Sequence, residues 1–238
     1  MLDRRRALKL LAGGAIATTG VMFMPAGNAI AAIRQQGKKR LAMVIDLSRC
    51  NGCKACVVSC GMENGTKPNE HRTQVIQTSA EIGDKQYAFN LPIMCNNCET
   101  PSCVSVCPTG ATFKREEDGI VVVDSTLCIG CNYCIQACPY GGVRFTNSTT
   151  GTVDKCNFCI QRTSRGLLPA CVETCTGGAR VFGDINDVNS EISKLLSQSN
   201  PMVLQASKQT SPNVFYIGLT QEESNTAFSI HSPQLWQR

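Results

Sequence analysis

The sixteen cysteines of this 238-residue chain constrain its fold more than any other feature. They form four groups of four, called here quartets one to four: 50/53/56/60, 95/98/103/107, 128/131/134/138 and 156/159/171/175. Every quartet opens with C-x2-C and closes with C-x3-C, whereas the length between these halves varies, most of all across residues 160–170. Loops absorb such variation and ligand pairs do not, so the pattern indicates metal binding.

Three kinds of cysteine site compete as explanations of the quartets. A disulfide framework is disfavoured because three sulfurs from one tight loop cannot all pair with distant partners. Structural zinc normally takes cysteines two and two, which leaves no use for a third thiol in the same loop. The run C-x2-C-x2-C-x3-C-P at residues 128–139 fits the bacterial ferredoxin pattern in full, so iron–sulfur clusters are favoured.

The closing C-x3-C of each quartet indicates that neighbouring clusters exchange ligands. In the ferredoxin run, the fourth cysteine ligates a different cluster from the first three. Cys60 is therefore expected to serve a second cluster, separate from the one that Cys50, Cys53 and Cys56 hold.

Internal repeats indicate which quartets belong together. Gly110, Gly141 and Gly178 each stand three places after the last cysteine of a quartet and before an apolar run, where glycine lets the chain turn with positive φ. Only quartets two and three carry Cys-Pro, and the linker KREEDGIVVVDST between them is typical of a two-cluster ferredoxin. We predict that quartets two and three form an inner unit and quartets one and four an outer unit.

The first 31 residues have the pattern of an export signal. A basic head, DRRRALK at residues 3–9, precedes an apolar run over residues 10–24, and Ala29–Ile30–Ala31 offers a cleavage site. The arginines followed by Leu8 and Lys9 resemble a twin-arginine signal, which implies export of a folded protein. A membrane anchor is the alternative, although glycines and threonines dilute the run and Pro25 stops it.

The charge and composition give no sign of a nucleic-acid partner. The formal net charge of +5 falls to +2 without residues 1–31, so the basic balance comes mostly from the leader. The run RQQGKKR at residues 34–40 has no interleaved aromatics and is expected to be solvated. Aromatics make up only 5% of the chain, so bound inorganic material is expected to supply part of the core.

The coarse pattern predicts an α+β fold of two nested ferredoxin-like units related by a pseudo-twofold. Strands are expected at residues 41–47, 75–78, 120–123, 181–182 and 214–219, and short helices at 102–106 and 133–137. Gly83–Asp84 predicts the turn of a hairpin insertion. Residues 187–199 predict an amphipathic helix with Asp187 as its cap and an apolar side of Val188, Ile192, Leu195 and Leu196.

This interpretation divides the chain into five segments. The signal covers residues 1–31, and the first half of the outer unit, with its hairpin, covers 41–94. The inner two-cluster unit covers 95–146 and the second half of the outer unit 147–186. A helix, a strand and a tail that would wrap a neighbouring subunit cover residues 187–238.

Four such quartets behind a twin-arginine signal resemble the iron–sulfur electron-transfer subunits of molybdopterin oxidoreductases of the dimethyl sulfoxide reductase type. The quartets alone specify only this superfamily. The segment LLPACVETC and the tail motifs SPNVFYIGL and LWQ are most similar to the B subunits of tetrathionate reductases. The similarity spans nearly the whole chain after the signal.

The resemblance implies four [4Fe-4S] clusters with nested ligand sets. One cluster would be held by Cys50, Cys53, Cys56 and Cys175, and its neighbour by Cys60, Cys156, Cys159 and Cys171. The inner clusters would be held by Cys95, Cys98, Cys103 and Cys138, and by Cys107, Cys128, Cys131 and Cys134. Some relatives replace one cysteine and hold a three-iron cluster, but this chain has all sixteen.

The resemblance also implies electron transfer without catalysis by this chain. Electrons would pass from an integral-membrane quinol-oxidising subunit, through the clusters, to a molybdopterin catalytic subunit that reduces tetrathionate to thiosulfate during anaerobic respiration. The complex would lie on the periplasmic side of the cytoplasmic membrane. The alternatives are the same role beside a polysulfide or thiosulfate reductase or a hydrogenase, and an iron–sulfur enzyme, which would need a quartet lacking one cysteine.

Side chains beside the ligands have more than one possible role. Apolar neighbours would keep water from the clusters or simply fill the core: Val57, Val104, Ile129, Ile135 and Phe158. Lys155, Arg162 and Arg165 would offset cluster charge, meet a partner or remain solvated. His71 and His231 lie outside the quartets, which argues against a mixed His/Cys cluster.

Overall fold

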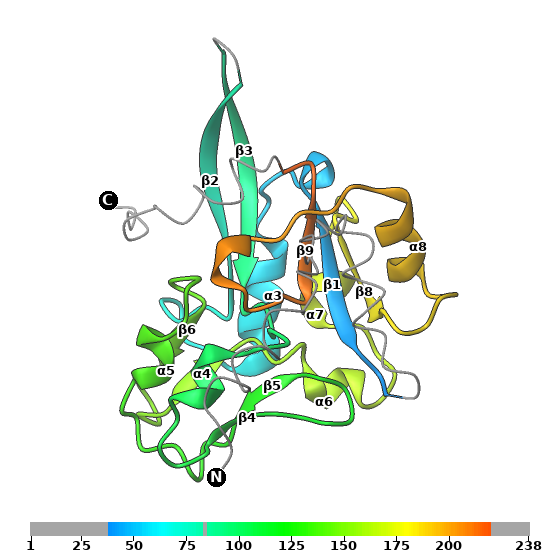
Figure 1. The fold of residues 1–238 in the computed structure, drawn as a ribbon. Helices are drawn as coiled ribbons and strands as arrows, with labels where there is room; N and C mark the ends of the chain where they lie inside the picture. Colours follow the sequence, from blue (N-terminus) through cyan, green and yellow to red (C-terminus); the bar gives the residue numbers. More distant parts are fainter. Residues whose placement is uncertain (1–37, 83–84, 220–238) are drawn as a thin grey trace, which may run out of the picture. The chain divides into compact units, whose positions relative to one another are not determined.

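The computed structural model describes residues 38–82 and 85–219. The predicted signal at residues 1–31, the predicted turn at Gly83–Asp84 and the tail from residue 220, with His231 and Trp236, lie outside the described residues. The described part combines short helices with small sheets (Figure 1), as the predicted α+β class requires. Within residues 38–82 and 85–219, no helix has both the length and the apolar character to span a membrane.

Strand β1 (Leu41–Asp46) is the middle strand of a three-stranded sheet with the order β8-β1-β9. Strand β8 (Arg180–Asp184) runs antiparallel to β1, and β9 (Val214–Ile217) runs parallel to it. These strands confirm the predictions at residues 41–47, 181–182 and 214–219, with small differences at their ends. The sheet joins the segment before quartet one to the segments that follow quartet four.

Strand β1 is buried on both faces, as the unbroken apolar run LAMVI suggests. Ala42 and Val44 belong to the core beneath helix α8 (Glu191–Gln198). Met43 and Ile45 belong to the larger core on the other face, which contains Cys56, Cys95, Cys156 and Cys171. Alternation along one strand therefore separates an ordinary apolar core from a cysteine-rich one.

Helix α8 begins later than predicted. Ser190 is its N-cap, and its hydroxyl oxygen accepts the backbone N–H three residues on at 3.2 Å. Asp187 instead caps the preceding turn, where its carboxylate accepts a backbone N–H at 2.9 Å. Val188 precedes the helix and is 57% exposed, so its predicted place on the apolar side is wrong. The rest of that side packs as predicted: Ile192, Leu195 and Leu196.

The predicted hairpin insertion is formed by strands β2 (Thr73–Ile82) and β3 (Lys85–Met94). The strands pair antiparallel along their whole length (Figure 1), and β3 ends one residue before Cys95. At the base, the Thr73 hydroxyl donates to the Ile93 carbonyl at 2.9 Å. The hairpin thus leads directly into the first cysteine of quartet two.

Short helices and two further hairpins surround the cysteine loops. The hairpins pair β4 (Thr112–Lys114) with β5 (Val121–Val123), and β6 (Arg144–Thr146) with β7 (Val153–Lys155). The third cysteine of each quartet lies in a helix: α3 (Ala55–Asn64), α4 (Ser102–Ser105), α5 (Tyr133–Gln136) and α7 (Ala170–Glu173). The remaining short helices are α6 (Ile160–Thr163) and the 3-10 helices η1 (Leu47–Arg49) and η2 (Ala206–Lys208).

The predicted glycine turns are present after quartets two, three and four. The φ angle is +70° at Gly110, +41° at Gly141 and +58° at Gly178. Because side chains other than glycine rarely adopt this backbone, the three glycines let the chain leave the last cysteine and enter β4, β6 or β8.

Candidate iron–sulfur cluster sites

The four C-x2-C loops share a left-handed residue just before the second cysteine. The φ angle is +74° at Gly52, +69° at Gly130, +43° at Asn97 and +53° at Phe158. Glycine and asparagine adopt this conformation readily, whereas phenylalanine does so at a cost. Phe158 is fully buried and meets Phe182 edge-on at 5.3 Å between ring centroids, a contact that holds the strained residue. The shared turn gives the four loops the same local shape.

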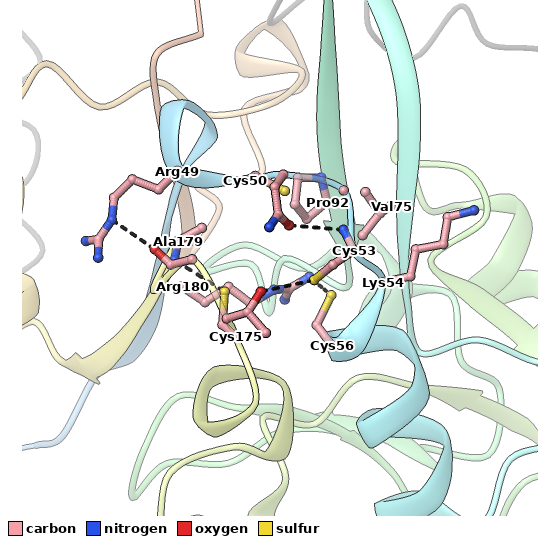
Figure 2. Close-up of a pocket in the computed structure, with 14 residues that line it drawn as sticks. Arg49, Cys50, Cys53, Lys54, Cys56, Val75, Pro92, Cys175, Ala179 and Arg180 are labelled. Carbon is pink, nitrogen blue, oxygen red and sulfur yellow. Dashed lines mark hydrogen bonds between the residues drawn. The ribbon is translucent and has the colours of Figure 1, made fainter.

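Four cysteines line one cavity of about 340 Å³ (Figure 2), called site I: Cys50, Cys53, Cys56 and Cys175. The first three come from the loop and first turn of α3, and the fourth follows α7. Val75 and Pro92 of the hairpin also line the cavity. Cys53 is exposed, and its sulfur lies 3.3 Å from the Thr176 hydroxyl. Site I therefore combines an apolar wall with one solvent-facing thiol.

Two more cavities are each lined by four cysteines. Site III, of about 300 Å³, is lined by Cys95, Cys98, Cys103 and Cys138. Site IV, of about 270 Å³, is lined by Cys107, Cys128, Cys131 and Cys134. Val121 and Val153 pack with Cys103 and Cys134 in one small apolar cluster that lies between these sites.

The remaining four cysteines form site II and are all buried: Cys60, Cys156, Cys159 and Cys171. Burial, then the neighbouring thiols of Cys171 and Cys159, raises the pKa of Cys60 to about 12. Burial, then Cys60 and Cys171, likewise raises the pKa of Cys156. Cys60 is thus influenced by two cysteines of quartet four, Cys171 and Cys159.

Three cavities are thus lined by the members of three predicted ligand sets, and the four cysteines of site II are those that remain. Each set takes three cysteines from one quartet and one from another, as Cys60 joins quartet four and Cys138 joins quartet two. None of the sixteen forms a disulfide, and all lie in the part of the chain that the structure describes. The exchange runs within the predicted inner and outer pairs of quartets.

Hydrogen-bond donors point at a sulfur in every site. Backbone N–H groups do so from Thr112 to Cys107 at 3.3 Å, Val153 to Cys128 at 3.5 Å, Phe158 to Cys156 at 3.4 Å and Ala179 to Cys175 at 3.2 Å. In site III, the donor is the Arg144 guanidinium, 2.8 Å from Cys103. Donors of this kind favour ionised sulfur, which is the form that binds metal.

Burial opposes ionisation of the core thiols. Loss of solvent, followed by the charge of Cys95, raises the pKa of Cys138 to about 12 and that of Cys98 to about 11. Burial would also raise the pKa of Cys95, but Lys155 and Arg144 outweigh it and the pKa is lowered. At the exposed edge of site I, a hydrogen bond with Thr176 lowers the pKa of Cys53. Metal binding in the core must therefore displace protons.

Three buried cations lie among the cysteines: Arg144 and Arg180 are 4% exposed and Lys155 is 3% exposed. Lys155 is among the charged residues expected near the clusters from the sequence, whereas Arg144 and Arg180 are not. A signal was present, because each arginine interrupts an apolar run shortly after a glycine turn, in GGVRF and in GGARVF. Sequence alone does not show burial, so such a residue is expected to be solvated.

The other charged and apolar candidates have mixed outcomes. Arg162 lies at the surface and pairs with Glu63 at 3.1 Å and with Glu173, and Arg165 is exposed. Ile129 is 67% exposed, so the expectation that it excludes water is wrong. The other apolar neighbours pack in the cores: Val57, Val104, Ile135 and Phe158. His71 lines none of the three cysteine cavities.

The donors around site III fit an anionic, sulfur-rich group. Among the described residues, Nε and Nη1 of Arg144 and Nδ2 of Asn96 are buried without a hydrogen-bond partner, and both residues line the cavity. Such donors are costly unless something accepts from them. Between residues 38 and 219, leaving out 83–84, no three His, Cys, Asp or Glu side chains converge closely enough for one metal ion. Thiols around a cavity suit a polynuclear cluster better than mononuclear zinc.

Two family models match the chain, and both describe 4Fe-4S dicluster domains. One matches residues 49–111 and the other residues 86–185. The sixteen cysteines all lie within the combined range. Binding of 4Fe-4S clusters, predicted from the quartets, is therefore supported by an independent comparison.

Several proteins of named complexes are similar to this chain. It is 47% identical over 231 residues to the tetrathionate reductase B subunit of Salmonella typhimurium (strain LT2), which covers 93% of the chain and 92% of that protein. It is 42% identical over 192 residues to the protein of the same name from Archaeoglobus fulgidus. That match covers 79% of this chain and 86% of the relative. It is 35% identical over 226 residues to the arsenate respiratory reductase iron-sulfur subunit ArrB of Shewanella sp. (strain ANA-3), with 75% and 96% covered. The resemblance predicted from the sequence motifs is confirmed.

Proposed function

This chain belongs to the family of iron–sulfur subunits that includes the tetrathionate reductase B subunits, and we propose that it is the electron-transfer subunit of such a complex. Its sixteen cysteines would hold four [4Fe-4S] clusters in sites I to IV. Each cluster, when bound by four thiolates, supplies a one-electron carrier with no vacant corner for a substrate. The gathering of the cysteines into four complete sets is the observation that carries this proposal.

We infer from the residues shared between sites that they follow one another in the order I, II, III, IV. Arg180 lies between Cys56 of site I and Cys171 of site II, at 3.5 and 3.7 Å from their sulfurs. Cys95 of site III is among the charges that, after burial, raise the pKa of Cys156 in site II. Arg144 contacts Cys103 of site III and also acts on Cys134 of site IV. This order supports a single row of carriers.

Solvent exposure supports exchange of electrons at the two ends of the row. Site I contains the exposed Cys53 and site IV contains the exposed Cys131, whereas no cysteine of sites II and III is exposed. The apolar cores around the middle sites exclude water and limit reorganisation around the carriers. The chain's own residues therefore insulate the middle of the row and leave its ends accessible to partners.

The substrate of the complex is proposed to be tetrathionate, reduced to thiosulfate by a molybdopterin catalytic subunit. The support is the 47% identity over nearly the whole length of a tetrathionate reductase B subunit, compared with 35% for ArrB over a smaller part of the chain. The donor would be an integral-membrane quinol-oxidising subunit. With the twin-arginine-like leader, the complex would act on the periplasmic side of the cytoplasmic membrane.

The decisive experiment is purification of the native complex under anaerobic conditions through an affinity tag on this chain. We expect mass spectrometry to identify a molybdenum-containing subunit and a membrane subunit, and elemental analysis to find iron and acid-labile sulfide equivalent to four clusters in this chain. Washed membranes should reduce tetrathionate with quinol as the donor. Zinc in place of iron would overturn the role as an electron carrier. A partner that reduces a different acceptor would overturn tetrathionate as the substrate.

A further inference from the structure

A buried cation lies near each junction between neighbouring sites. Arg180 faces sulfurs of sites I and II, and Lys155 joins Cys156 of site II to Val121, which lines site III. Arg144 contacts Cys103 of site III, which packs in one apolar cluster with Cys134 of site IV. The ion pairs formed by the described residues involve other side chains, so no carboxylate in the described part of the chain neutralises these three. Their regular placement calls for an explanation beyond packing.

Arg180 bridges the outer pair of sites. Its Nη2 donates to Cys56 at 3.5 Å (Figure 2). Nη2 also donates to the Thr73 hydroxyl at 3.0 Å, and Nη1 faces Cys171 at 3.7 Å. The remaining neighbours of Nη1 are the thioethers of Met43 and Met94. The guanidinium is thus held between two sulfurs that belong to different sites.

Arg144 occupies the equivalent place in the inner pair. It begins β6 as Arg180 begins β8, and it meets the third cysteine of one quartet, Cys103, at 2.8 Å. The charge of the third cysteine of the other quartet, Cys134, also acts on it. The pseudo-symmetry of the two units therefore extends from the cysteines to a cation in each.

Lys155 lies where the outer and inner pairs meet. Its ammonium group donates to the Cys156 carbonyl at 2.9 Å, to Asn97 Oδ1 at 3.3 Å and to the Val121 carbonyl. It directly precedes Cys156 of site II, and its charge acts on Cys95 and Cys103 of site III. Each of its hydrogen-bond acceptors is uncharged, so the positive charge itself is not cancelled there.

We infer that Arg180, Lys155 and Arg144 are the counter-charges of the electron path, each raising the reduction potentials of both clusters that flank it. The inference rests on the proposed function. Burying a cation without a partner carries a large free-energy cost, and the nearby groups able to offset it are the thiolates and the clusters that they hold. A positive charge between two sites stabilises the extra electron on either one and screens the repulsion between them.

Redox titration of the purified holoprotein, followed by electron paramagnetic resonance, tests this inference. In Arg180→Gln, two of the four potentials should fall, each by at least tenfold in the reduction equilibrium constant, which is about 59 mV for a one-electron couple. In Arg144→Gln, the other two potentials, those of sites III and IV, should fall. In Lys155→Gln, one potential that Arg180→Gln lowers and one that Arg144→Gln lowers should fall. The pattern requires no prior assignment of signals to sites.

Two controls separate charge from structure. Arg180→Lys keeps the charge and should retain most of the wild-type potentials of both clusters. Arg165→Gln removes the same charge beside quartet four, but from a side chain exposed to water, and should leave all four potentials unchanged. Iron and sulfide analysis of every variant verifies that the clusters are present.

The outcomes distinguish this inference from the proposed function. Unchanged potentials in the Gln variants with full iron content, or the same pair shifting in all three, would overturn the counter-charge role while the four-cluster carrier stands. Wild-type protein with fewer than four clusters would overturn the proposed function itself. If one Gln variant loses iron, the potentials of the other two variants decide.

Discussion

At the scale of single residues, the spacing of cysteines along a helix determines which site each thiol lines. Cys56 and Cys60 both belong to α3, four residues apart, so they lie on one face of the helix about one turn from each other. Cys56 belongs to site I, whereas Cys60 belongs to site II. A spacing of one turn therefore lets one helix reach two neighbouring sites, which explains the closing C-x3-C of quartet one in physical terms.

Replacing Cys60 tests this crossed arrangement. We expect Cys60→Ser to lose or convert the cluster held by Cys156, Cys159 and Cys171 and to leave the one held by Cys50, Cys53 and Cys56. Electron paramagnetic resonance of the reduced variant, with iron analysis, measures the loss. Loss of the site I signal with the site II signal intact would contradict the ligand sets.

Arg72 provides a second test at the residue scale. Its guanidinium pairs with Asp154 at 2.9 Å and donates to Asn64 at 2.6 Å, tying the end of α3 to the segment that leads into quartet four. Because the pair is partly buried, Arg72→Met should lower stability by about 1–3 kcal/mol. The loss of the clusters' visible absorbance on heating measures the midpoint temperature of thermal unfolding.

The matched control for Arg72 is Lys38→Met. Lys38 forms an ion pair with Glu116, and the two side chains are 51% and 89% exposed. Removing this pair should therefore leave the midpoint of thermal unfolding nearly unchanged. Equal midpoints for the Arg72 and Lys38 variants would mean that the Arg72 contacts do not stabilise the fold.

At the scale of elements, helices α3 and α7 and the loops around them form the outer pair of sites. The two helices pack against each other: α3 contributes Cys56 to site I and Cys60 to site II, whereas α7 contributes Cys171 to site II and is followed by Cys175 of site I. The loop after α7 approaches η1 closely, because a Cβ on Gly177 would lie 2.2 Å from the Arg49 carbonyl oxygen. This close approach brings Cys175 to the cavity of site I.

Gly177→Ala is expected to displace that loop and damage site I. A clash with backbone cannot be relieved by a change of rotamer, so the cluster at site I should be incorporated poorly, with sites III and IV unaffected. Iron content and the spectrum of the reduced protein report the change. Normal iron content in Gly177→Ala would show that the loop accommodates the extra atom.

Gly61→Ala is the matched control for this substitution. Gly61 lies inside α3, and a Cβ there would make an ordinary contact, 3.6 Å from the Thr66 hydroxyl. Alanine is favoured over glycine in a helix by about 0.8–1.0 kcal/mol, so this variant should keep its clusters and be slightly more stable.

At the scale of the whole molecule, the row of sites spans segments far apart in sequence. Strand β1 precedes quartet one and pairs with β8 and β9, which follow quartet four, so the sheet joins the two ends of the cysteine-containing part of the chain. In the proposed order of the sites, the exposed thiols of Cys53 and Cys131 belong to the first and the last site. This arrangement suits a carrier between two partners.

Export of the folded holoprotein is a prediction at this scale. Replacing Arg4, Arg5 and Arg6 with lysine keeps the charge of the leader but removes its arginines. We expect the variant to accumulate in the cytoplasm with its iron bound, because twin-arginine export requires the arginines and not merely the charge. Cell fractionation with immunodetection measures the distribution, and unchanged export would exclude this route.

Local physics made much of this protein predictable from its residues. The C-x2-C and C-x3-C spacings act within one loop or one helix turn, and the glycine turns and the strand LAMVI also depend on neighbours along the chain. Sequence reasoning therefore identified the thiols, the turns and most strands. It misplaced the cap of α8, since Asp187 and Ser190 are both good caps and packing selected Ser190.

The burial of the cations could be recognised only in the tertiary structure, because it arises from contacts between residues far apart in the sequence. Arg180 contacts Cys56, 124 residues away in the sequence, and Arg144 contacts Cys103, 41 residues away. No local pattern distinguishes such an arginine from a solvated one, and the free energy of burying it depends on which sulfurs surround it. The short spacings between cysteines therefore determine the ligand chemistry from the sequence alone. The electrostatic environment of the electron path depends on the tertiary structure, because it forms only when the four quartets come together.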